Sequence, residues 1–537
     1  MYNTNFLTRT LSTVKGPFSI KKMNKPVRVR FAPSPTGPLH AGGVRTALYN
    51  YLFARQQGGK MLLRIEDTDQ NRFVPGAEAY ILEALEWLGI VIDEGPQTGG
   101  PHAPYRQSER KPIYREYAER LVQEGKAYYA FDTTEELDAM RKRMEEAKVA
   151  AVQYNAITRQ EMTNSLTLSR EDTKARIASG EPYVIRMKIM PKEDIRFNDL
   201  IRGWVVVHSS QVDDKVLLKS DGMPTYHLAN IVDDHLMGIT HVIRGEEWLP
   251  SAPLHVLLYR YLGWESTMPQ FAHLPLLLKP DGNGKLSKRD ADLGGFPIFP
   301  LEWTDPVTGD KAKGFREEGY AADSTANFLA LLGWNAGTEQ EIFSMDELIK
   351  AFSFERVHKA GARFDIQKAN WFNQQYIKQR DDNSLVAELV PIYQGRGIEV
   401  SSEHIAQIVH LLKDRVHLVK DIVDESLFLF NAPEVYDQDV MVKKWNEEAV
   451  NAILGFKEAL EIYQGDFTAD VIKHLLSETM ESLGIKMGKI MQALRLAVTG
   501  VAAGPDLMIT MEILGKEEVI SRLSNAINRL PAQVRLA

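Results

Sequence analysis

The stretch that most constrains the fold lies near the start of the chain, at residues 30–43, and reads RFAPSPTGPLHAGG. An alternating apolar run leads into it, prolines and glycines interrupt that run, and apolar residues recur at helical spacing over residues 44–52. This order predicts a strand, a tight loop and a helix. The N-terminus of such a helix can hold a phosphate chain, with His40 at its mouth. Gly42 and Gly43 would let a ligand approach the backbone closely.

A second stretch, KLSKR at residues 285–289, follows the turn-forming sequence DGNG. Its cations Lys285, Lys288 and Arg289 suit a triphosphate whose negative charge grows during cleavage. Each stretch alone also permits a plainer interpretation. The first would be an ordinary connection between a strand and a helix, and the second a solvated surface loop.

Together the two stretches resemble the paired signatures of class I aminoacyl-tRNA synthetases. Further blocks occur in the order found in bacterial-type glutamyl-tRNA synthetase, which the chain resembles over about residues 25–537 and most densely before residue 290. These blocks are residues 31–43, 64–69, 95–96, 105–110, 218–222, 224–230, 232–235 and 244–248. The resemblance implies a fold and a set of site residues, both of which are expectations at this point.

The implied fold is an α/β Rossmann-like class I synthetase catalytic domain with an α+β acceptor-binding insertion, followed by an all-α C-terminal anticodon-binding domain. We expect a disordered N-terminal extension at 1–24, the first Rossmann half at 25–125 and the insertion at 126–215. The second Rossmann half, with the basic loop, would occupy residues 216–290. Residues 291–350 would form a connecting region that contacts the tRNA stem, and residues 351–537 would form the anticodon-binding domain.

The last third of the chain carries apolar residues at 3,4 spacing, which predicts helices. The segments are 404–423, 447–463, 470–483, 487–498 and 517–530. This pattern favours the bacterial glutamyl type, because the related glutaminyl enzymes end in β-barrels.

Residues 293–320 depart from the family, whose members pass quickly from the basic loop to the next helix. This segment is rich in glycine and proline and contains Trp303. We expect a loop or hairpin beside the site, interpret it as a lineage-specific surface insertion, and assign it no role.

The resemblance implies a role for each of a set of residues. The catalytic residues would be His40, Lys285 and Lys288, and ATP would be bound by His40, Gly42, Gly43, Lys285, Ser287, Lys288 and Arg289. Glutamate would be bound by Arg30, Ser34, Glu66, Tyr226, Asn230 and Arg244, and Trp248 would lie near the tRNA end. In this set the guanidiniums of Arg30 and Arg244 suit carboxylates and Glu66 suits an ammonium group. The alternative for these three is an internal salt-bridge network, but their places at predicted strand ends favour a pocket.

The chain has no cysteine, which excludes disulfides, a thiol nucleophile and a Cys-ligated zinc. Relatives carry a Cys-rich zinc site near the equivalent of residues 128–132, so we expect no structural zinc here. No metal ligand is expected from protein side chains, and Mg²⁺ would arrive on ATP. The net charge of −8 means that a tRNA partner must be bound through local clusters of Lys and Arg.

The implied activity is ATP-dependent activation of L-glutamate and its transfer to the 3′-terminal ribose of tRNA(Glu). The alternatives are a non-discriminating enzyme that also charges tRNA(Gln), a tRNA-binding paralogue, a tRNA-modifying relative and a small-molecule adenylyltransferase. The last two have no use for the long C-terminal part, and a paralogue would be expected to lose His40 or the lysines.

Residues 1–22 hold four cations and no acid. They resemble either an organelle-targeting presequence, which would make the protein mitochondrial, or an upstream start before Met23. We favour the second interpretation and a cytoplasmic monomer. We expect no membrane span, because no apolar run approaches 18 residues.

Overall fold

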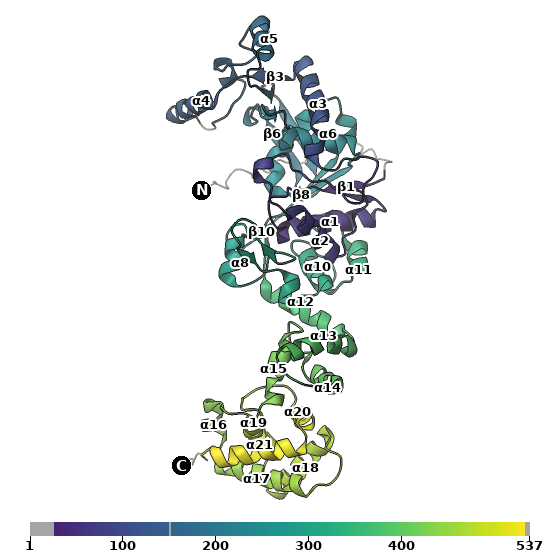
Figure 1. The fold of residues 1–537 in the computed structure, drawn as a ribbon, viewed down its shortest axis with the longest axis vertical. Coiled ribbons are helices and arrows are strands. Elements are labelled where there is room, and N and C mark those ends of the chain that lie inside the picture. Colours follow the sequence, from purple (N-terminus) through teal and green to yellow (C-terminus); the bar gives the residue numbers. More distant parts are fainter. Residues whose placement is uncertain (1–25, 150–151, 532–537) are drawn as a thin grey trace.

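The computed structural model describes residues 26–149 and 152–531, so the predictions for residues 1–24 lie outside this part of the chain. The α/β part occupies one end of an elongated molecule, and helices alone fill the other end (Figure 1). Within the described ranges, no helix combines the length and apolar character needed to cross a membrane.

The catalytic part is built on parallel strands from both halves of the predicted Rossmann fold. One sheet has the order β6-β5-β9-β8, and a separate parallel pair joins β1 to β2. The two sheets meet where the Thr240 N–H donates to the Arg28 carbonyl at 2.9 Å. The strands are β1 (Arg28–Phe31), β2 (Lys60–Leu63), β5 (Asp194–Asp199), β6 (Gly203–His208), β8 (His241–Gly245) and β9 (Gln270–Leu274).

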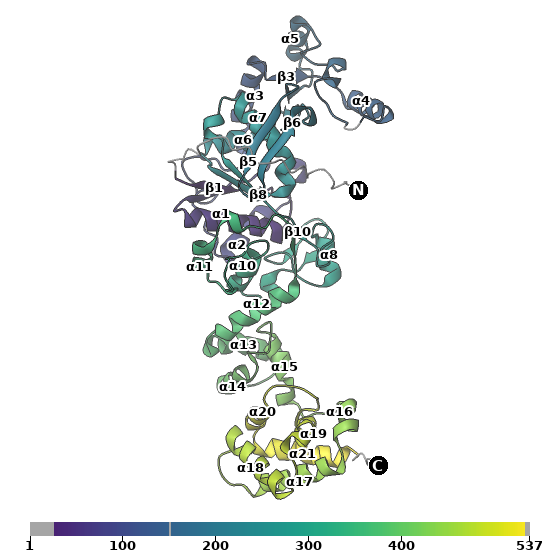
Figure 2. The same cartoon turned by 180° about the vertical axis from the view of Figure 1, so that it is seen from behind.

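Helices surround this layer, as both views of the molecule show (Figures 1 and 2). They are α1 (Ala41–Gln56), α2 (Ala77–Trp87), α3 (Lys111–Gln123), α6 (Tyr226–Leu236) and α7 (Ala252–Tyr261). The first of them, α1, has apolar residues on most of its surface and is buried along its length between the sheet and the connecting region. Burial on both sides fixes the position of its N-terminus, which carries His40.

A smaller antiparallel sheet, β3-β4-β7, forms the centre of the insertion. The insertion contains β3 (Ala127–Ala130), α4 (Thr134–Glu146), α5 (Arg170–Ala178) and β4 (Val184–Met187), and β7 (Val216–Leu218) completes its sheet. A capping box between Thr133 and Glu136 starts α4. Strand pairing differs from the expected division at two places. Strand β5, expected within 126–215, pairs with β9, and β7, expected within 216–290, pairs with β4.

Residues 293–320 contain the expected hairpin, but the interpretation of a surface insertion is wrong. Ile298 and Leu301 are each 1% exposed and Trp303 is 9% exposed, in the same core as α1 and β1. The exposed parts of the segment include Leu293, at its start, and the hairpin tip with Val307. The elements between residues 277 and 318 are β10 (Leu277–Leu278), α8 (Lys288–Gly294), β11 (Trp303–Thr304), β12 (Lys311–Ala312) and α9 (Phe315–Glu318). Strands β11 and β12 pair antiparallel.

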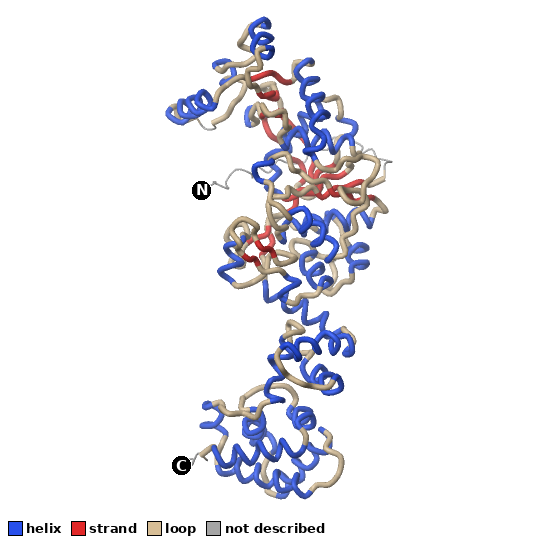
Figure 3. Tube along the Cα trace, in the orientation of Figure 1, coloured by secondary structure: helices blue, strands red, loops and turns tan. Residues whose placement is uncertain are grey.

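Helices α10 (Ala322–Ala330) and α11 (Met345–Ala351) complete the α/β end, and β13 (Ala362–Arg363) pairs with β10. From residue 366 to residue 531 every assigned element is a helix (Figure 3), which confirms the prediction of an all-α C-terminal part. These helices are α12 (Ile366–Gln379), α13 (Asp382–Gly395), α14 (Ser402–Leu412), α15 (Asp421–Phe430), α16 (Gln438–Lys444), α17 (Glu447–Ile462), α18 (Ala469–Ser482), α19 (Met487–Thr499), α20 (Leu507–Leu514) and α21 (Lys516–Arg529).

The helical part has two cores. One is formed mainly by α13–α15, with Ile377 of α12 and Ile513 of α20, and the other is formed by α16–α21. The apolar pattern over residues 404–423 corresponds to two helices, α14 and α15, rather than one. The spacing of apolar residues continues across their junction, so periodicity alone does not show the break.

Candidate active site

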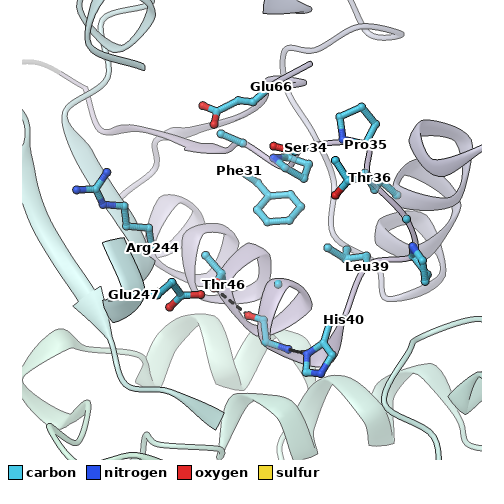
Figure 4. A pocket seen from close by; sticks show the side chains of 18 of the residues that line it. Phe31, Ser34, Pro35, Thr36, Leu39, His40, Thr46, Glu66, Arg244 and Glu247 are labelled. Carbon is cyan, nitrogen blue, oxygen red and sulfur yellow. Dashed lines mark hydrogen bonds between the residues drawn. The ribbon is translucent and has the colours of Figure 1, made fainter. Parts of the chain in front are cut away.

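A cavity of about 750 Å³ opens at the carboxyl ends of β1 and β8, between the N-terminus of α1 and the basic loop. In Figure 4, Glu66 and His40 lie at opposite ends of this cavity, and Arg244 enters it from β8. All the residues predicted for the site line the cavity except Ser287 and Arg289.

His40 is the N-cap residue of α1, where its Nδ1 accepts a hydrogen bond from the Gly42 N–H at 3.0 Å. In the neutral ring the proton is therefore on Nε2, which is buried and has no partner among the described residues. Burial, and to a smaller extent the charge of Lys285, lowers the pKa of His40 to about 4, while Glu247 acts in the opposite direction. The imidazole is therefore a neutral donor near neutral pH.

Gly42 and Gly43, which follow His40, differ in how much space the structure leaves for a side chain. A Cβ at Gly43 would lie 2.7 Å from Leu39 Cδ1, which is too close for the packed loop. A Cβ at Gly42 would meet nothing closer than 3.5 Å, so the space there can accommodate one. Close packing thus requires glycine at position 43, and a ligand that approaches the helix N-terminus gains access at both positions.

The basic loop is a short hairpin in which the Leu286 N–H donates to the Leu277 carbonyl at 2.9 Å. Lys285 forms an exposed ion pair with Glu247, with 3.4 Å between Nζ and Oε1. Lys288 begins α8 and also lines the cavity. Ser287 instead caps α8 by exchanging hydrogen bonds with Asp290, and Arg289 is exposed outside the cavity.

Glu66 and Arg30 are the two ends of a buried ion-pair chain. Arg30 Nε donates to Asp234 Oδ1 at 3.0 Å, and the same oxygen accepts from Arg64 NH1 at 2.8 Å. Arg64 NH2 then donates to Glu66 Oε1 at 3.1 Å, and Asn230 Nδ2 approaches the same oxygen at 3.3 Å. Burial raises the pKa of the Glu66 carboxyl, which the charges of Arg64 and Arg30 oppose.

The salt-bridge network considered as an alternative is therefore present, and the cavity lies at its two ends. No acceptor among the described residues bonds the terminal guanidinium nitrogens of Arg30, and no donor bonds Glu66 Oε2. These atoms are free to bind a ligand, whereas Arg64 and Asp234 are buried and do not line the cavity. Sequence reasoning assigned no role to Arg64 or Asp234, although both lie in the blocks that carry the resemblance.

Arg244, at the end of β8, is held on all three nitrogens. Its Nε donates to His273 Nε2 at 3.0 Å, its NH1 to the Tyr226 hydroxyl at 2.8 Å, and its NH2 to the Trp248 carbonyl at 3.3 Å. NH1 also lies 3.3 Å from His255 Nδ1. With five N–H groups, Arg244 retains about one for a ligand, so Arg30 is better able to make a two-bond contact with a carboxylate.

The remaining predicted residues complete the opening of the cavity. The rings of Tyr226 and Trp248 lie 4.3 Å apart, and Trp248 is 40% exposed. Ser34 is exposed in the loop after β1. Sequence reasoning missed several lining residues, of which Glu247 follows Arg244 in a resemblance block. The 293–320 segment, which was expected beside the site, lines the cavity with Phe299, Trp303 and Asp305, although none of these residues was assigned a role from the sequence.

The cavity thus has one end suited to phosphates and one suited to an amino acid. His40 Nε2, Lys285 and Lys288 provide donors and positive charge at the first end. Arg30, Arg244 and Glu66 provide two cations and one anion at the second. Within the described ranges, no group of three His, Cys, Asp or Glu side chains is arranged to hold a metal ion.

Two family descriptions match the chain in sequence. Residues 26–371 match "tRNA synthetases class I (E and Q), catalytic domain", and residues 384–527 match "Anticodon binding domain".

Relatives match over nearly the whole chain. The glutamate–tRNA ligase of Cytophaga hutchinsonii is 66% identical over 511 residues, which cover 95% of this chain and 99% of that protein. The glutamate–tRNA ligase of Amoebophilus asiaticus is 58% identical over 505 residues, covering 94% and 98%. A crystal structure of a glutamate tRNA ligase from Elizabethkingia meningosepticum in complex with its amino acid is 51% identical, with a TM-score of 0.88, and covers 94% of this chain and all of that one.

Fold, site geometry and sequence therefore agree, and the chain belongs to the class I tRNA synthetases of the E and Q type, among the glutamate–tRNA ligases.

Proposed function

We propose that this protein activates L-glutamate with ATP and transfers the glutamyl group to the 3′-terminal ribose of tRNA(Glu). In the first step an α-carboxylate oxygen of glutamate bonds to the α-phosphorus of ATP, and the bond from that phosphorus to the β-phosphate oxygen breaks. Glutamyl-adenylate and pyrophosphate result. In the second step a ribose hydroxyl takes the acyl group and AMP leaves. The observation that supports this proposal most strongly is the cavity that has Arg30 and Glu66 at one end and His40 at the other.

At the amino-acid end, Glu66 Oε2 receives the ammonium group, and Arg30 and Arg244 bind the carboxylates. Ser34, Tyr226 and Asn230 complete this end, the last two by holding Arg244 and Glu66. A guanidinium facing the side-chain carboxylate gives a charge-assisted bond of roughly 1.5–3 kcal/mol, which the neutral amide of glutamine does not match. This difference favours glutamate over glutamine.

At the nucleotide end, the neutral His40 donates from Nε2 to the phosphates, next to the N–H groups of Gly42 and Gly43. Lys285 and Lys288 move over the β- and γ-phosphates as charge develops on them. To reach the phosphates, Lys285 must break its ion pair with Glu247. The pair is exposed and therefore weak, so breaking it costs little. Mg²⁺, bound through ATP, supplies neutralisation of the leaving pyrophosphate. Ser287 holds the start of α8, so its part in ATP binding is indirect.

The tRNA binds along the elongated molecule, with its 3′ end near Trp248 and its anticodon at the helical end. We assign residues 126–215 to the acceptor end, 291–350 to the stem and 351–537 to the anticodon. We propose a cytoplasmic monomer, and no structural zinc. Discrimination between tRNA(Glu) and tRNA(Gln) would depend on contacts near residues 356–363, and a non-discriminating enzyme is the second candidate.

ATP–pyrophosphate exchange tests this proposal. The reaction is run with glutamate and with glutamine, each in the presence and absence of purified tRNA(Glu). We expect exchange with glutamate only, and only when tRNA is present, as the family resemblance implies. Exchange without tRNA would favour the tRNA-modifying relative or a simpler adenylyltransferase. Absence of exchange under every condition would favour a tRNA-binding paralogue.

A further inference from the structure

The 293–320 segment contributes directly to the nucleotide end of the cavity. Phe299, Trp303 and Asp305 line it, although the segment follows the basic loop and lies far from residues 30–43 in sequence. Phe299 is 6% exposed and Trp303 is 9% exposed. The segment is therefore part of the wall that faces the bound nucleotide under the proposed function.

The segment is anchored on both sides of that wall. The Tyr80 hydroxyl of α2 donates to the Leu301 carbonyl at 2.6 Å and lies 3.1 Å from the Leu301 N–H. The ring of Trp303 packs edge-on against Tyr80, with 5.3 Å between centroids. The Phe315 N–H donates to the Phe299 carbonyl at 2.8 Å. These contacts fix the backbone around Phe299 rather than leaving it as a mobile loop.

Two contacts reach the N-terminus of α1 itself. The Ile298 carbonyl accepts a hydrogen bond at 2.8 Å from the Ala41 N–H. This N–H belongs to the first residue of α1 and has no acceptor within the helix. The ring of Phe299 lies edge-on to the His40 imidazole, with 6.0 Å between centroids and an interplanar angle of 89°. Adjacent residues of one segment thus hold the helix start and the side chain that caps it.

We propose that Phe299 is a positioning residue for His40, which it holds in the orientation that presents Nε2 to the nucleotide phosphates. The contact also excludes water from one side of the imidazole, and burial is the main reason that His40 stays neutral. The other groups that bear on this ring are Lys285 of the basic loop and Glu247 after β8. The inference deepens the proposed function and rests on it, because it concerns the same nucleotide end.

The test uses the full-length protein with Phe299→Leu and Phe299→Ala, and with Phe296→Leu as the matched control. Phe296 belongs to the same segment and is 9% exposed, but it stacks on Phe364 and does not line the cavity. The pKa of His40 is followed by NMR in histidine-labelled protein, and its signal is assigned by its loss in His40→Asn. The Michaelis constants for ATP and glutamate are measured separately by pyrophosphate exchange across pH 5–8.

We expect Phe299→Ala to raise the pKa of His40 from about 4 toward the ordinary value of 6.5. The kcat/KM for ATP should fall about tenfold, as expected when one charge-assisted hydrogen bond is weakened, with its acid limb moved to higher pH. The KM for glutamate should stay within about twofold. Phe299→Leu should give the same changes in smaller measure, and Phe296→Leu should give neither.

An unchanged His40 titration and an unchanged ATP dependence in folded Phe299→Leu would overturn the inference. Equal losses in Phe299→Leu and Phe296→Leu would also overturn it, because they would show a general packing effect. Failure of the wild-type protein to catalyse exchange would instead count against the proposed function, and the NMR titration would still decide the relation between Phe299 and His40.

Discussion

Arg244 and His273 are joined by a buried hydrogen bond, in which Arg244 Nε donates to His273 Nε2 at 3.0 Å. His273 Nδ1 lies 2.6 Å from Asp199 Oδ2, and both side chains are fully buried. The carboxylate therefore places the ring proton on Nδ1, which leaves Nε2 as an acceptor for the arginine. Asp199 thus helps to orient Arg244 through the imidazole, without itself reaching the cavity.

Replacing His273 should weaken glutamate binding more than ATP binding. His273→Ala leaves Arg244 Nε without its acceptor, and we expect the KM for glutamate to rise about tenfold, since a hydrogen bond to a charged group is lost. His273→Gln, which can offer an oxygen acceptor, should recover part of the loss. Steady-state pyrophosphate exchange measures both constants. Equal KM values for glutamate in His273→Ala and wild type would show that the contact does not orient Arg244.

Glu66→Gln should weaken glutamate binding by roughly 1.5–3 kcal/mol, because the ammonium group loses its charged acceptor. The KM for ATP should change little. Asp69→Asn is a suitable control, since Asp69 also lines the cavity but is paired with Arg72 at its surface. Isothermal titration with glutamate compares the two variants. A Glu66→Gln protein that binds glutamate as tightly as Asp69→Asn would remove Glu66 from the pocket.

Lys288→Ala should slow adenylate formation more than it weakens glutamate binding, because the lysine acts on the charge that develops on the phosphates. Lys311→Ala provides the comparison, since Lys311 is an exposed lysine of the β11–β12 hairpin and pairs with Glu302. Single-turnover formation of adenylate in the presence of tRNA gives the rate directly. Unchanged turnover in Lys288→Ala would eliminate the assigned role.

Trp303→Ala should destabilise the catalytic part by about 3 kcal/mol, the scale for deleting a large buried aromatic side chain. Val307→Ala, at the hairpin tip where the side chain is 86% exposed, should change stability by less than about 0.5 kcal/mol. Urea denaturation, monitored by far-ultraviolet circular dichroism, gives the free energy of unfolding of both variants. Similar, small effects of the two substitutions would restore the interpretation of a surface insertion.

Acidification below about pH 6.5 should destabilise the fold through buried histidines. Burial lowers the pKa of His40, His227 and His241 to about 4, so the folded protein binds fewer protons than the unfolded chain below pH 6.5. Stability then falls as pH decreases from about 6.5 to about 4, by up to roughly 1.4 kcal/mol per pH unit for each histidine. Urea midpoints at pH 7 and pH 5 check the sign. A higher midpoint at pH 5 would contradict it.

The local signals of the sequence were sufficient for the strand, loop and helix around His40, because each depends on neighbouring residues. The helical C-terminal part followed from apolar spacing in the same way. These features need no knowledge of distant contacts.

Other features depend on pairs far apart in the chain. Arg64 and Asp234 are separated by 170 positions, and nothing in the spacing of either indicates the other. The pairing of β5 with β9 and of β7 with β4 also differed from the expected division of the chain. The reason is similar, because the apolar pattern of a strand does not specify which strand it pairs with. The burial of Trp303 was missed because the segment around it has neither helical nor strand periodicity.

The most direct test of the central claim is transfer of labelled glutamate to a tRNA(Glu) transcript that is either intact or oxidised with periodate, which destroys the 3′-terminal ribose diol. If the protein charges the 3′ end, label should enter the intact transcript with ATP and be absent from the oxidised one. Equal labelling of the two transcripts would place glutamate elsewhere on the tRNA, and no labelling of the intact transcript would contradict aminoacylation altogether.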